Sequence, residues 1–350
     1  MQSAIRNPKS ALFNGPPEEF ASALEGWFAR HRKDYPWRRT RDPYAILVAE
    51  VMLQQTQIAT VLDRGFYVRW LERFPDFAAL AVASEEEVLR TWEGLGYYRR
   101  ARNLQKLAQV IVAEHGGQMP RDPAQILALP GIGPYTAGAV ASFAFDLPEP
   151  IVDGNVARVL SRVFNDATPI DSTEGQRLLW QRATTLVRAA VRPSDFNSAL
   201  MELGQTHCRV GQPECGQCPV RTFCRATEPA ELPVKGRRTV ITEVTERVFF
   251  RRRDEEVLLE QEVGKRRTGL WKLPALPEST GKLPPVLHKM TYGITRYRVT
   301  LWIHAAPAEV ALPAAHRFVT ATELAGLPMP APYRKALNVV MREGDFRLDG

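Results

Sequence analysis

Two acidic residues, Glu50 and Asp153, lie in surroundings that suit them to chemistry. Glu50 is placed inside an apolar run that reads V-A-E-V-M-L over residues 48–53. Burial disfavours the charged form of a carboxyl group and raises its pKa, so a buried Glu50 stays protonated near neutral pH and can act as a general acid. The alternative, an exposed position on an amphipathic helix, is left open by the local pattern.

Asp153 directly precedes the segment G-N-V-A-R-V-L at residues 154–160, whose apolar spacing predicts a helix. An aspartate in this position is most often an N-cap that accepts hydrogen bonds from backbone amides. Its negative charge can also stabilise a cationic, oxocarbenium-like transition state. The two roles are compatible, and the pattern does not choose between them.

The four cysteines of the chain all fall in one short segment. Cys208, Cys215, Cys218 and Cys224 are separated by six, two and five residues. This clustering indicates a metal site in a reducing compartment and argues against disulfides. Four thiolates suit either zinc or an iron–sulfur cluster, although zinc ligands more often come as two short pairs far apart.

Aromatic and basic residues occur together at two further places. Residues 94–102 read G-L-G-Y-Y-R-R-A-R, and Tyr97 follows the glycine turn. Trp37 and Arg38 stand beside Pro36 where a predicted helix is interrupted. Such groups suit stacking on bases and contact with phosphates, but they also occur as core aromatics at a solvated helix end.

The element that organises these residues is a predicted hairpin, P-G-I-G-P at residues 130–134, between helices at 124–129 and 135–145. Gly131 and Gly133 permit a sharp turn, and Pro134 suits the first turn of the following helix. Backbone amides at a helix N-terminus form a natural phosphate site. A simple helix–helix corner is the alternative.

Other helices are predicted from residue 17 to 31 and from 43 to 57, and several amphipathic helices are predicted between 64 and 118. After a polar connector the pattern changes. Residues 246–253 and 256–263 resemble paired strands, residues 297–304 alternate with period two, and a last helix is expected from 332 to 343. The chain therefore predicts a mainly α domain followed by an α+β domain.

Composition is consistent with a soluble protein that binds a polyanion. The net charge is +7, with 45% hydrophobic and 24% charged residues, and the pI is near 9.3. Charge alone does not separate DNA from RNA or an acidic membrane surface. No apolar run reaches the length of a membrane span, and residues 1–16 lack the apolar core of a secretory signal. We expect a disordered tail there and a cytoplasmic location, nucleoid-associated if the source is bacterial.

Two motifs carry a resemblance to a known family. L-P-G-I-G-P-Y-T-A-G at residues 129–138 and V-D-G-N-V-A-R-V at 152–159 resemble the helix-hairpin-helix DNA glycosylases with the Gly-Pro/Asp signature. E-V-M-L-Q-Q-T-Q at 50–57 and the cysteine spacing are similar to those of the MutY family of adenine glycosylases. The resemblance implies a [4Fe–4S] cluster on the four cysteines and a monomeric protein that binds duplex DNA.

The resemblance also implies roles for single residues. Glu50 would protonate adenine, Asp153 would act at the sugar, and Tyr135 and Asn155 would organise the aspartate and its water. The remaining candidates would contact the DNA: Trp37 and Arg38 at the base, Gln55 and Tyr97 in the base stack, and Gly131 and Gly133 at a phosphate.

The second domain resembles the Nudix-like domain of the same family, with G-L-W-K-L-P at residues 269–274 as the best local match. The R-E-x-x-E-E run of Nudix hydrolases is absent, which argues against pyrophosphate hydrolysis. Members commonly carry a Phe-Ser-His loop that probes 8-oxoguanine, and Met290-Thr291-Tyr292 stand in its place here. The expected domains are a glycosylase domain at 17–228 with its cluster loop at 208–224, a linker at 229–238 and a recognition domain at 239–350.

The function implied is hydrolytic removal of adenine mispaired with 8-oxoguanine or guanine. One rival is a glycosylase with lyase activity resembling endonuclease III, which carries a lysine where this chain has Tyr135. The other rival is an iron–sulfur protein that binds DNA without catalysis.

Overall fold

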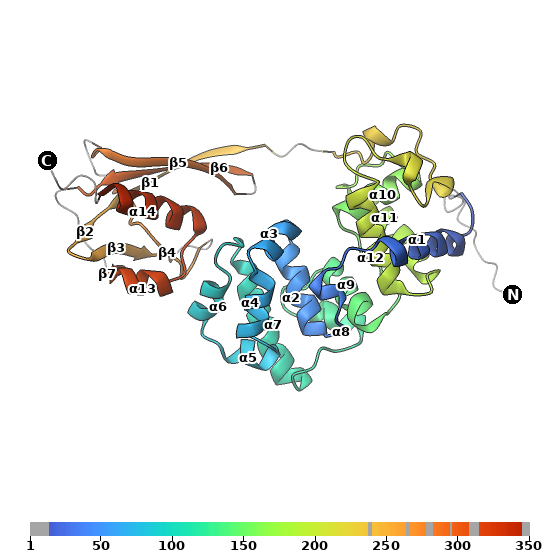
Figure 1. The fold of residues 1–350 in the computed structure, drawn as a ribbon, viewed down its shortest axis with the longest axis horizontal. Helices are drawn as coiled ribbons and strands as arrows, with labels where there is room; N and C mark the ends of the chain where they lie inside the picture. The colour runs from blue at the N-terminus through green and yellow to red at the C-terminus, as the bar shows by residue number, and fades with distance from the viewer. Residues whose placement is uncertain are drawn as a thin grey trace. The chain divides into compact units, whose positions relative to one another are not determined.

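A computed structural model describes most of the chain, and its contacts divide it into two compact units (Figure 1). The described residues are 14–236, 240–263, 267–277, 283–294, 296–307 and 315–344. The first unit comprises Met1–Gln55 and Val110–Arg238, and the second comprises Thr56–Gln109 and Thr239–Gly350. Most of the predicted N-terminal tail lies outside the described residues.

The longer elements of the first unit are all helices. Its helices are α1 (Pro17–His31), α2 (Pro43–Leu53), α8 (Pro123–Ala128), α9 (Pro134–Phe145), α10 (Gly154–Val163), α11 (Thr173–Arg188) and α12 (Pro193–Thr206). The predicted helix at residues 17–31 is confirmed, and the helix predicted at 135–145 begins one residue earlier. Among the described residues, no helix is both long and apolar enough to span a membrane.

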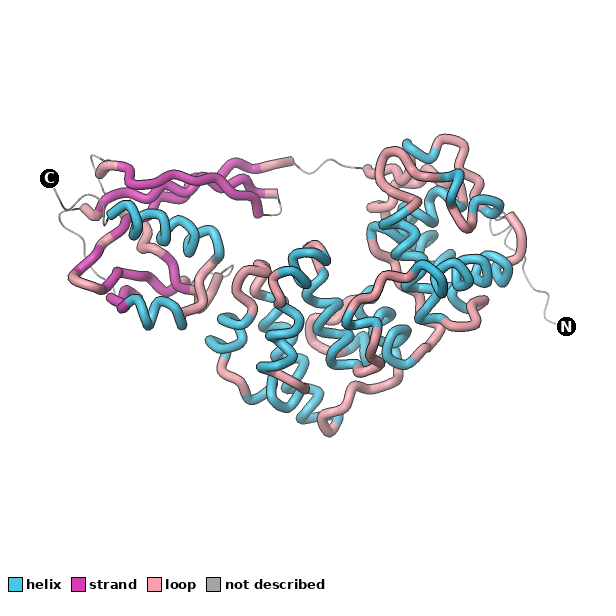
Figure 2. Tube along the Cα trace, in the orientation of Figure 1, coloured by secondary structure: helices cyan, strands magenta, loops and turns pink. Residues whose placement is uncertain are grey.

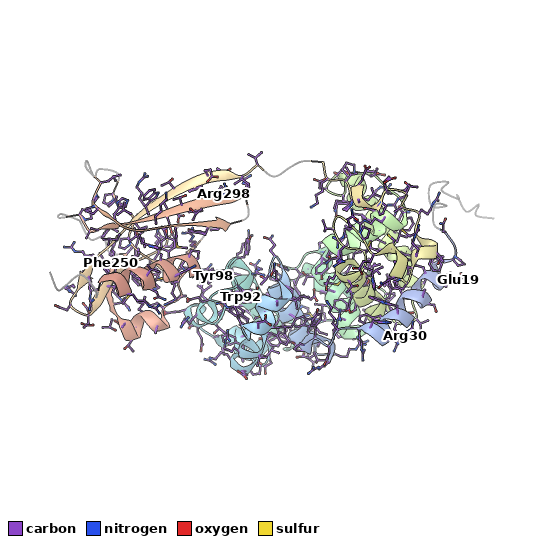
Figure 3. All side chains as sticks on the ribbon, turned by 45° about the horizontal axis from the view of Figure 1, so that its top comes forward. Glu19, Arg30, Trp92, Tyr98, Phe250 and Arg298 are labelled. Atoms are coloured by element: carbon purple, nitrogen blue, oxygen red, sulfur yellow. The ribbon has the colours of Figure 1, made fainter. Side chains whose placement is uncertain are left out.

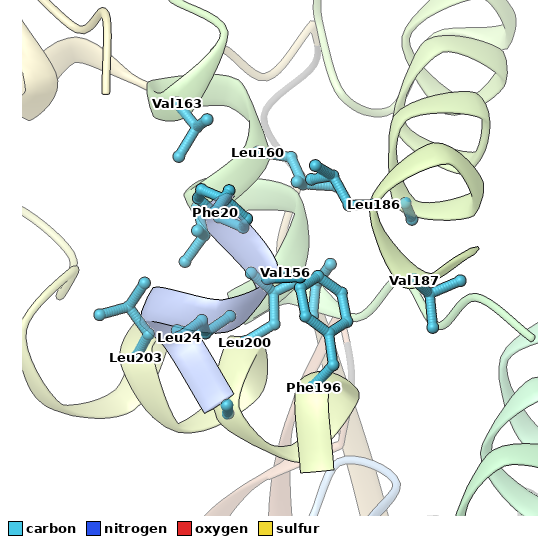
Figure 4. Close-up of a cluster of buried hydrophobic side chains, with 14 of the residues drawn as sticks. Phe20, Leu24, Val156, Leu160, Val163, Leu186, Val187, Phe196, Leu200 and Leu203 are labelled. Carbon is cyan, nitrogen blue, oxygen red and sulfur yellow. The ribbon is translucent and has the colours of Figure 1, made fainter. Parts of the chain in front are cut away.

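One hydrophobic core joins α1, α10, α11 and α12 with Ala139 of α9, and Figure 4 shows part of it. Each helix contributes an apolar face, so the sequence spacing of leucine, valine and phenylalanine becomes the packing surface. The side chains are Phe20 and Leu24 from α1, Val156, Leu160 and Val163 from α10, Leu186 and Val187 from α11, and Phe196, Leu200 and Leu203 from α12.

Two glycines set how closely neighbouring segments approach in this unit. A Cβ atom added at Gly138 of α9 would lie 2.2 Å from the carbonyl oxygen of Pro150. A Cβ atom at Gly204 of α12 would lie 2.7 Å from Cβ of Asn155. Gly204 therefore allows α12 to pack directly against the start of α10, where Asp153 and Asn155 lie.

The beginning of the predicted linker is attached to the first unit. The carbonyl of Leu232 accepts a hydrogen bond from Nε of Arg162 at 3.0 Å, and the carbonyl of Val234 accepts one from Ile170 N at 3.0 Å. Gly236 N donates to the Asp171 carboxylate at 2.8 Å. Residues 237–239 lie outside the described ranges.

The helical part of the second unit confirms the predicted run of amphipathic helices. It contains α3 (Ile58–Asp63), α4 (Phe66–Arg73), α5 (Phe77–Val82), α6 (Glu85–Thr91) and most of α7 (Arg99–His115). Asp76 and Ser84 cap α5 and α6 through side-chain oxygens that accept backbone N–H bonds.

Two small sheets and two helices form the rest of the second unit, drawn in magenta and cyan in Figure 2. The first sheet has the order β1 (Thr242–Phe250), β6 (Tyr297–Ala305), β5 (Val286–Ile294). In the second, β3 (Glu256–Gln261) pairs with β2 (Arg252–Arg253), β4 (Trp271–Lys272) and β7 (His316–Thr320). The helices are α13 (Ala321–Gly326) and α14 (Ala331–Gly344), and α14 packs against β5.

The predicted strand pairing is only partly correct. Residues 246–253 were expected to pair with 256–263, but only Arg252 and Arg253 pair with β3. The chain changes sheet near Arg251, and β1 runs parallel to β6 instead. This partner is about fifty residues away in sequence, and local alternation carries no information about such a pairing. The predicted C-terminal helix is confirmed as α14.

Candidate active site

Glu50 is buried, as its apolar sequence neighbours predict. Its side chain lies on α2 at 5% relative exposure, and Oε2 accepts a hydrogen bond of 2.8 Å from the hydroxyl of Tyr135. Burial raises the pKa of Glu50 from 4.5 to about 7. The Tyr135 hydrogen bond and the charge of Arg38 oppose this rise, whereas the charge of Asp153 adds to it. A carboxyl group with this pKa can donate a proton near neutral pH.

Tyr135 lies in the first turn of α9, and its hydroxyl contacts the acid. Burial and the charges of Glu50 and Asp153 raise the pKa of its phenol well above 10, so the hydroxyl stays protonated and donates. The resemblance implied that Tyr135 organises Asp153 and its water. The structure shows the Tyr135 hydroxyl donating to Glu50, and the role at Asp153 and its water stays a prediction.

Asp153 is the N-cap of α10. Its carboxylate accepts hydrogen bonds from Val156 N at 2.7 Å and from Nδ2 of Asn155 at 2.8 Å. Both oxygens therefore have a donor, and the side chain is fixed at the positive end of a helix. The capping role predicted for Asp153 is confirmed, and the contact between Asp153 and Asn155 brings two candidates together.

An arginine connects this aspartate to the cysteine segment. Nη2 of Arg158 donates to Oδ1 of Asn155 at 3.0 Å and to the carbonyl of Gly204 at 2.6 Å. Nε of the same side chain donates to the carbonyl of Cys208 at 2.8 Å. Arg158 thereby orients the amide of Asn155 so that its Nδ2 points at Asp153.

Three of the four cysteines lie at two short 3-10 turns: Cys215 begins the turn Cys215–Gln217, Cys218 follows it, and Cys224 follows the turn Arg221–Phe223. Arg162 donates through Nη1 to Sγ of Cys208 at 3.3 Å. Burial raises the pKa of Cys208 and Cys224, and raises that of Cys218 to about 11, with the neighbouring thiols contributing. Among the described residues, no group of three or more histidine, cysteine, aspartate or glutamate side chains is arranged to hold a single metal ion.

Trp37 and Arg38 form the turn η1 (Pro36–Arg38) at the entrance to α2. Trp37 stacks on Tyr35 with ring centroids 5.2 Å apart. Nη1 of Arg38 donates to Oε2 of Glu202 at 2.5 Å, and its guanidinium lies over the Tyr35 ring at 4.8 Å. Arg38 therefore has a firm protein partner on α12.

Glu202 is a site residue that the sequence predictions missed. It is 1% exposed, and besides Arg38 it accepts a hydrogen bond of 3.0 Å from Lys33 N. Its sequence context, A-L-M-E-L-G, is as apolar as that of Glu50, and the same reasoning about a buried carboxylate would have found it.

The hairpin before α9 forms as predicted, with different roles for its two glycines. Gly131 has φ +76°, a left-handed conformation that favours glycine. Gly133 is the extended N-cap of α9, with φ −106°, and Pro134 occupies the first helical position. The N-terminus of this 12-residue helix thus follows a turn in which Ile132 is flanked by two glycines.

Gln55 and Tyr97 share an unusual backbone conformation. The helix predicted at residues 43–57 ends at Leu53, and Gln55 has φ +57°. Tyr97, in the other unit, has φ +47° and is 39% exposed. Left-handed backbone at residues other than glycine costs about 1–3 kcal/mol and is found preferentially at functional sites.

The prediction that Met290-Thr291-Tyr292 form a loop is wrong. All three lie inside β5 and pair with Leu301, Thr300 and Val299 of β6, and β5 ends at Ile294. Side chains alternate across a strand, so Met290 and Tyr292 pack on the core and Thr291 faces outward. The Tyr292 hydroxyl donates to Glu246 at 2.8 Å. No local motif marked the end of β5, so the sequence did not show that the strand continues to Ile294.

Comparison with known proteins agrees with this geometry. The signature described as HhH-GPD superfamily base excision DNA repair protein matches residues 48–184. The chain is 44% identical over 203 residues to the adenine DNA glycosylase of Mycolicibacterium smegmatis, covering 58% of this chain and 67% of that protein. The structure of a thermostable thymine-DNA glycosylase, 32% identical, matches with a TM-score of 0.55 over 61% of this chain and 96% of its own.

A buried acid, a capped aspartate and a Gly-Pro hairpin lie in the part of the chain that these matches cover. The chain belongs to the HhH-GPD superfamily of base excision DNA repair proteins. Mammalian relatives are also similar: the adenine DNA glycosylase of Mus musculus is 49% identical over 216 residues, which are 59% of this chain and 41% of that protein. The chain thus spans about two-fifths of the length of the mouse protein.

Proposed function

We propose that the protein removes adenine from duplex DNA where adenine is mispaired with 8-oxoguanine or guanine. The observation that carries this proposal is the buried pair of Glu50 and Tyr135, with the Glu50 pKa near 7, in the same unit as the capped Asp153. The family membership and the adenine DNA glycosylases among its relatives support it.

In the proposed reaction, adenine is first rotated out of the duplex, which costs a few kcal/mol of stacking and pairing. The Glu50 carboxyl protonates a ring nitrogen of adenine, and the bond between adenine and the sugar breaks with its electrons moving to the base. Asp153 stabilises the positive charge that develops on the sugar. Water adds to the sugar carbon and its proton passes to the Glu50 carboxylate, which restores the acid and leaves free adenine and an abasic site.

The N-terminus of α9 is the proposed site for a DNA phosphate. Gly131 and Gly133 leave the backbone amides accessible, and the helix dipole favours an anion there. The positive net charge of +7 favours the same partner. We propose that the protein acts as a monomer on DNA in the cytoplasm.

The cysteine segment is proposed to hold a [4Fe–4S] cluster. The donor set of Cys208, Cys215, Cys218 and Cys224 fits the group: four thiols lie within electrostatic reach of one another, and Arg162 donates to Cys208. A single zinc ion requires sulfur atoms about 2.3 Å from one point, whereas a cluster accepts wider spacing. When bound, the cluster supplies structural cross-linking of the loop and no step of base removal.

Metal analysis tests the cofactor directly. Protein purified without oxygen is expected to be brown and to contain iron and sulfide in equal amounts. Stoichiometric zinc without sulfide would contradict the proposal.

The C-terminal domain is proposed to be a Nudix-like module that recognises 8-oxoguanine. Of Met290, Thr291 and Tyr292 on β5, only Thr291 faces outward, and its hydroxyl lies 3.5 Å from that of Thr300. Thr291→Ala is expected to slow adenine removal opposite 8-oxoguanine more than opposite guanine, because only the oxidised base offers the extra polar groups. An equal effect on both substrates would show that Thr291 does not recognise the lesion.

A panel of four duplexes tests the activity itself. The substrates carry adenine opposite 8-oxoguanine, thymine glycol opposite adenine, thymine opposite guanine, or no damage. We expect release of adenine from the first only, and little covalent trapping by borohydride, because Tyr135 has no amine to attack the sugar. Excision of thymine glycol with efficient trapping would favour the lyase rival, and binding without excision would favour the non-catalytic one.

A further inference from the structure

The turn that carries Tyr97 is held in a strained conformation. It follows α6 and precedes α7, and three of its four residues from Gly94 to Tyr97 have left-handed backbone, with φ +103° at Gly94, +68° at Gly96 and +47° at Tyr97. Tyr97 is the residue for which that conformation is least favourable, since it bears a large side chain. Such strain persists only where surrounding contacts determine the backbone.

Two side chains of the helical part donate hydrogen bonds to carbonyls of this turn. The indole Nε1 of Trp92 donates to the carbonyl of Gly96 at 2.9 Å. Nη2 of Arg100 donates to the carbonyls of Leu95 at 3.0 Å and Gly96 at 3.3 Å. The Arg100 guanidinium also lies over the rings of Trp92 and Tyr97, at 5.2 and 5.5 Å.

Residues of the C-terminal domain bond to Glu93 and Tyr98, which border this turn. The buried Tyr98 hydroxyl, next to Tyr97, donates to the carbonyl of Met329 at 3.0 Å. Oε2 of Glu93 accepts from Met329 N at 3.3 Å and from Nη2 of Arg334 at 3.0 Å, and Oε1 accepts from Nε of Arg334. Trp92 and Tyr98, which flank the turn, are labelled in Figure 3.

The Arg334 side chain is 21% exposed, and each of its three guanidinium nitrogens donates to a protein acceptor. Its guanidinium also donates to the carbonyls of Leu324 at 3.1 Å and Leu327 at 2.6 Å, and the Glu93 side chain is only 9% exposed. A two-point ion pair at this depth has a defined geometry, and loss of either partner leaves the other charge poorly compensated. Arg334 is therefore suited to hold Glu93 in place rather than to contact a ligand.

We propose that Arg334 acts through Glu93 as a positioning residue for Tyr97, so that the C-terminal domain fixes the turn that presents this aromatic side chain to DNA. The inference rests on the proposed function only because it takes DNA as the ligand that Tyr97 contacts. It gives the C-terminal domain a second role, independent of reading the oxidised base, that applies to every duplex.

The test is a double-mutant cycle on DNA affinity with Arg334→Met and Tyr97→Ala. The probes are an undamaged duplex and one with a reduced abasic site opposite guanine, so the cycle can be measured whether or not the protein excises adenine. We expect Arg334→Met to weaken binding about tenfold in the native background and to have no effect in the Tyr97→Ala background. The slope of affinity against salt is expected to stay unchanged, because no phosphate contact is lost.

Glu93→Gln separates positioning from simple electrostatics. Removing a negative charge strengthens binding to DNA if charge alone matters, whereas positioning predicts weaker binding. The control is Arg317→Met, which removes the partner of Glu323 within the C-terminal domain and is expected to leave affinity unchanged. Equal losses from Arg334→Met with and without Tyr97, or tighter binding by Glu93→Gln, would overturn the proposal. If Arg334→Met does not fold, the same cycle with Glu93→Gln decides the question.

Discussion

Glu50 owes its chemical character to a helix that is buried on every face. All residues from Tyr44 to Met52 of α2 are buried, so Glu50 has no route to solvent along the helix. The hydrogen bond from Tyr135 partly compensates the carboxylate and keeps the pKa of Glu50 near 7. Without that bond the acid would be a weaker proton donor.

The first prediction concerns the pH dependence of adenine release in single-turnover experiments. In the proposed reaction Glu50 acts in its protonated form, so the rate should be level below pH 7 and fall about tenfold per unit well above it. Tyr135→Phe removes a hydrogen bond that lowers the pKa of Glu50, and the descending limb should therefore move to higher pH. A limb that stays in place in the variant would show that Tyr135 does not tune the acid.

The second prediction is that Glu50 weakens the fold at alkaline pH. Its pKa is about 7 in the folded protein against 4.5 for the free group, so the folded state keeps a proton that the unfolded chain releases. Stability is lost as pH rises between these values, by up to about 3 kcal/mol. Glu50→Gln has no such loss. Urea unfolding at pH 5 and pH 8 should show that the free energy of unfolding of Glu50→Gln rises relative to that of the native protein as the pH increases. A difference between the two proteins that is the same at both pH values would contradict the buried-acid assignment.

What could be predicted at the residue scale followed from local patterns. The burial of Glu50, the cap at Asp153 and the turn at Gly131 are each encoded within a few neighbouring residues. The bond between Arg38 and Glu202 joins residues 164 positions apart, and the contact between Tyr135 and Glu50 joins residues 85 apart. Such contacts depend on helix packing that periodicity alone does not specify.

At the scale of elements, the site depends on how closely α12 approaches α10. Gly204 lies against Asn155, and its carbonyl accepts a hydrogen bond from Arg158. The spacing of these two helices therefore sets the position of the amide that contacts Asp153.

The third prediction tests this spacing with Gly204→Ala. The new Cβ would lie 2.7 Å from Cβ of Asn155, so the helices must separate. We expect a loss of about 1–3 kcal/mol in the free energy of unfolding together with slower excision. Gly154→Ala is the matched control, since a Cβ there meets nothing within 4 Å. Equal stability of the two variants in urea would show that the close approach is not required.

Helices and strands differed in how far the sequence predicted them. A helix depends on its own residues and caps, and the helices beginning at Pro17 and Pro134 were located to within one residue. A strand depends on partners far along the chain. The parallel pairing of β1 with β6 and the position of Met290-Thr291-Tyr292 within β5 were therefore missed.

At the scale of the whole molecule, the residues proposed for catalysis are gathered in one unit. Glu50, Tyr135, Asp153 and Asn155 all belong to the first unit, although they come from α2, α9 and the start of α10. Residues 56–109 form one unit with residues 239–350. No linker-like stretch in the sequence predicts that the unit is made of two separate segments. The change of pattern near residue 240 nevertheless marked where the sheets begin.

The most direct test of the central claim is single-turnover release of adenine, opposite 8-oxoguanine, by Glu50→Gln. The amide keeps the shape of the side chain but has no proton to give, so the rate should fall by about 10²–10⁴-fold while duplex binding persists. The control is Glu25→Gln on α1, another buried glutamate, which accepts a hydrogen bond from Arg192 N and is expected to retain activity. Excision by Glu50→Gln at a rate close to that of the native protein would contradict the assignment of Glu50 as the acid.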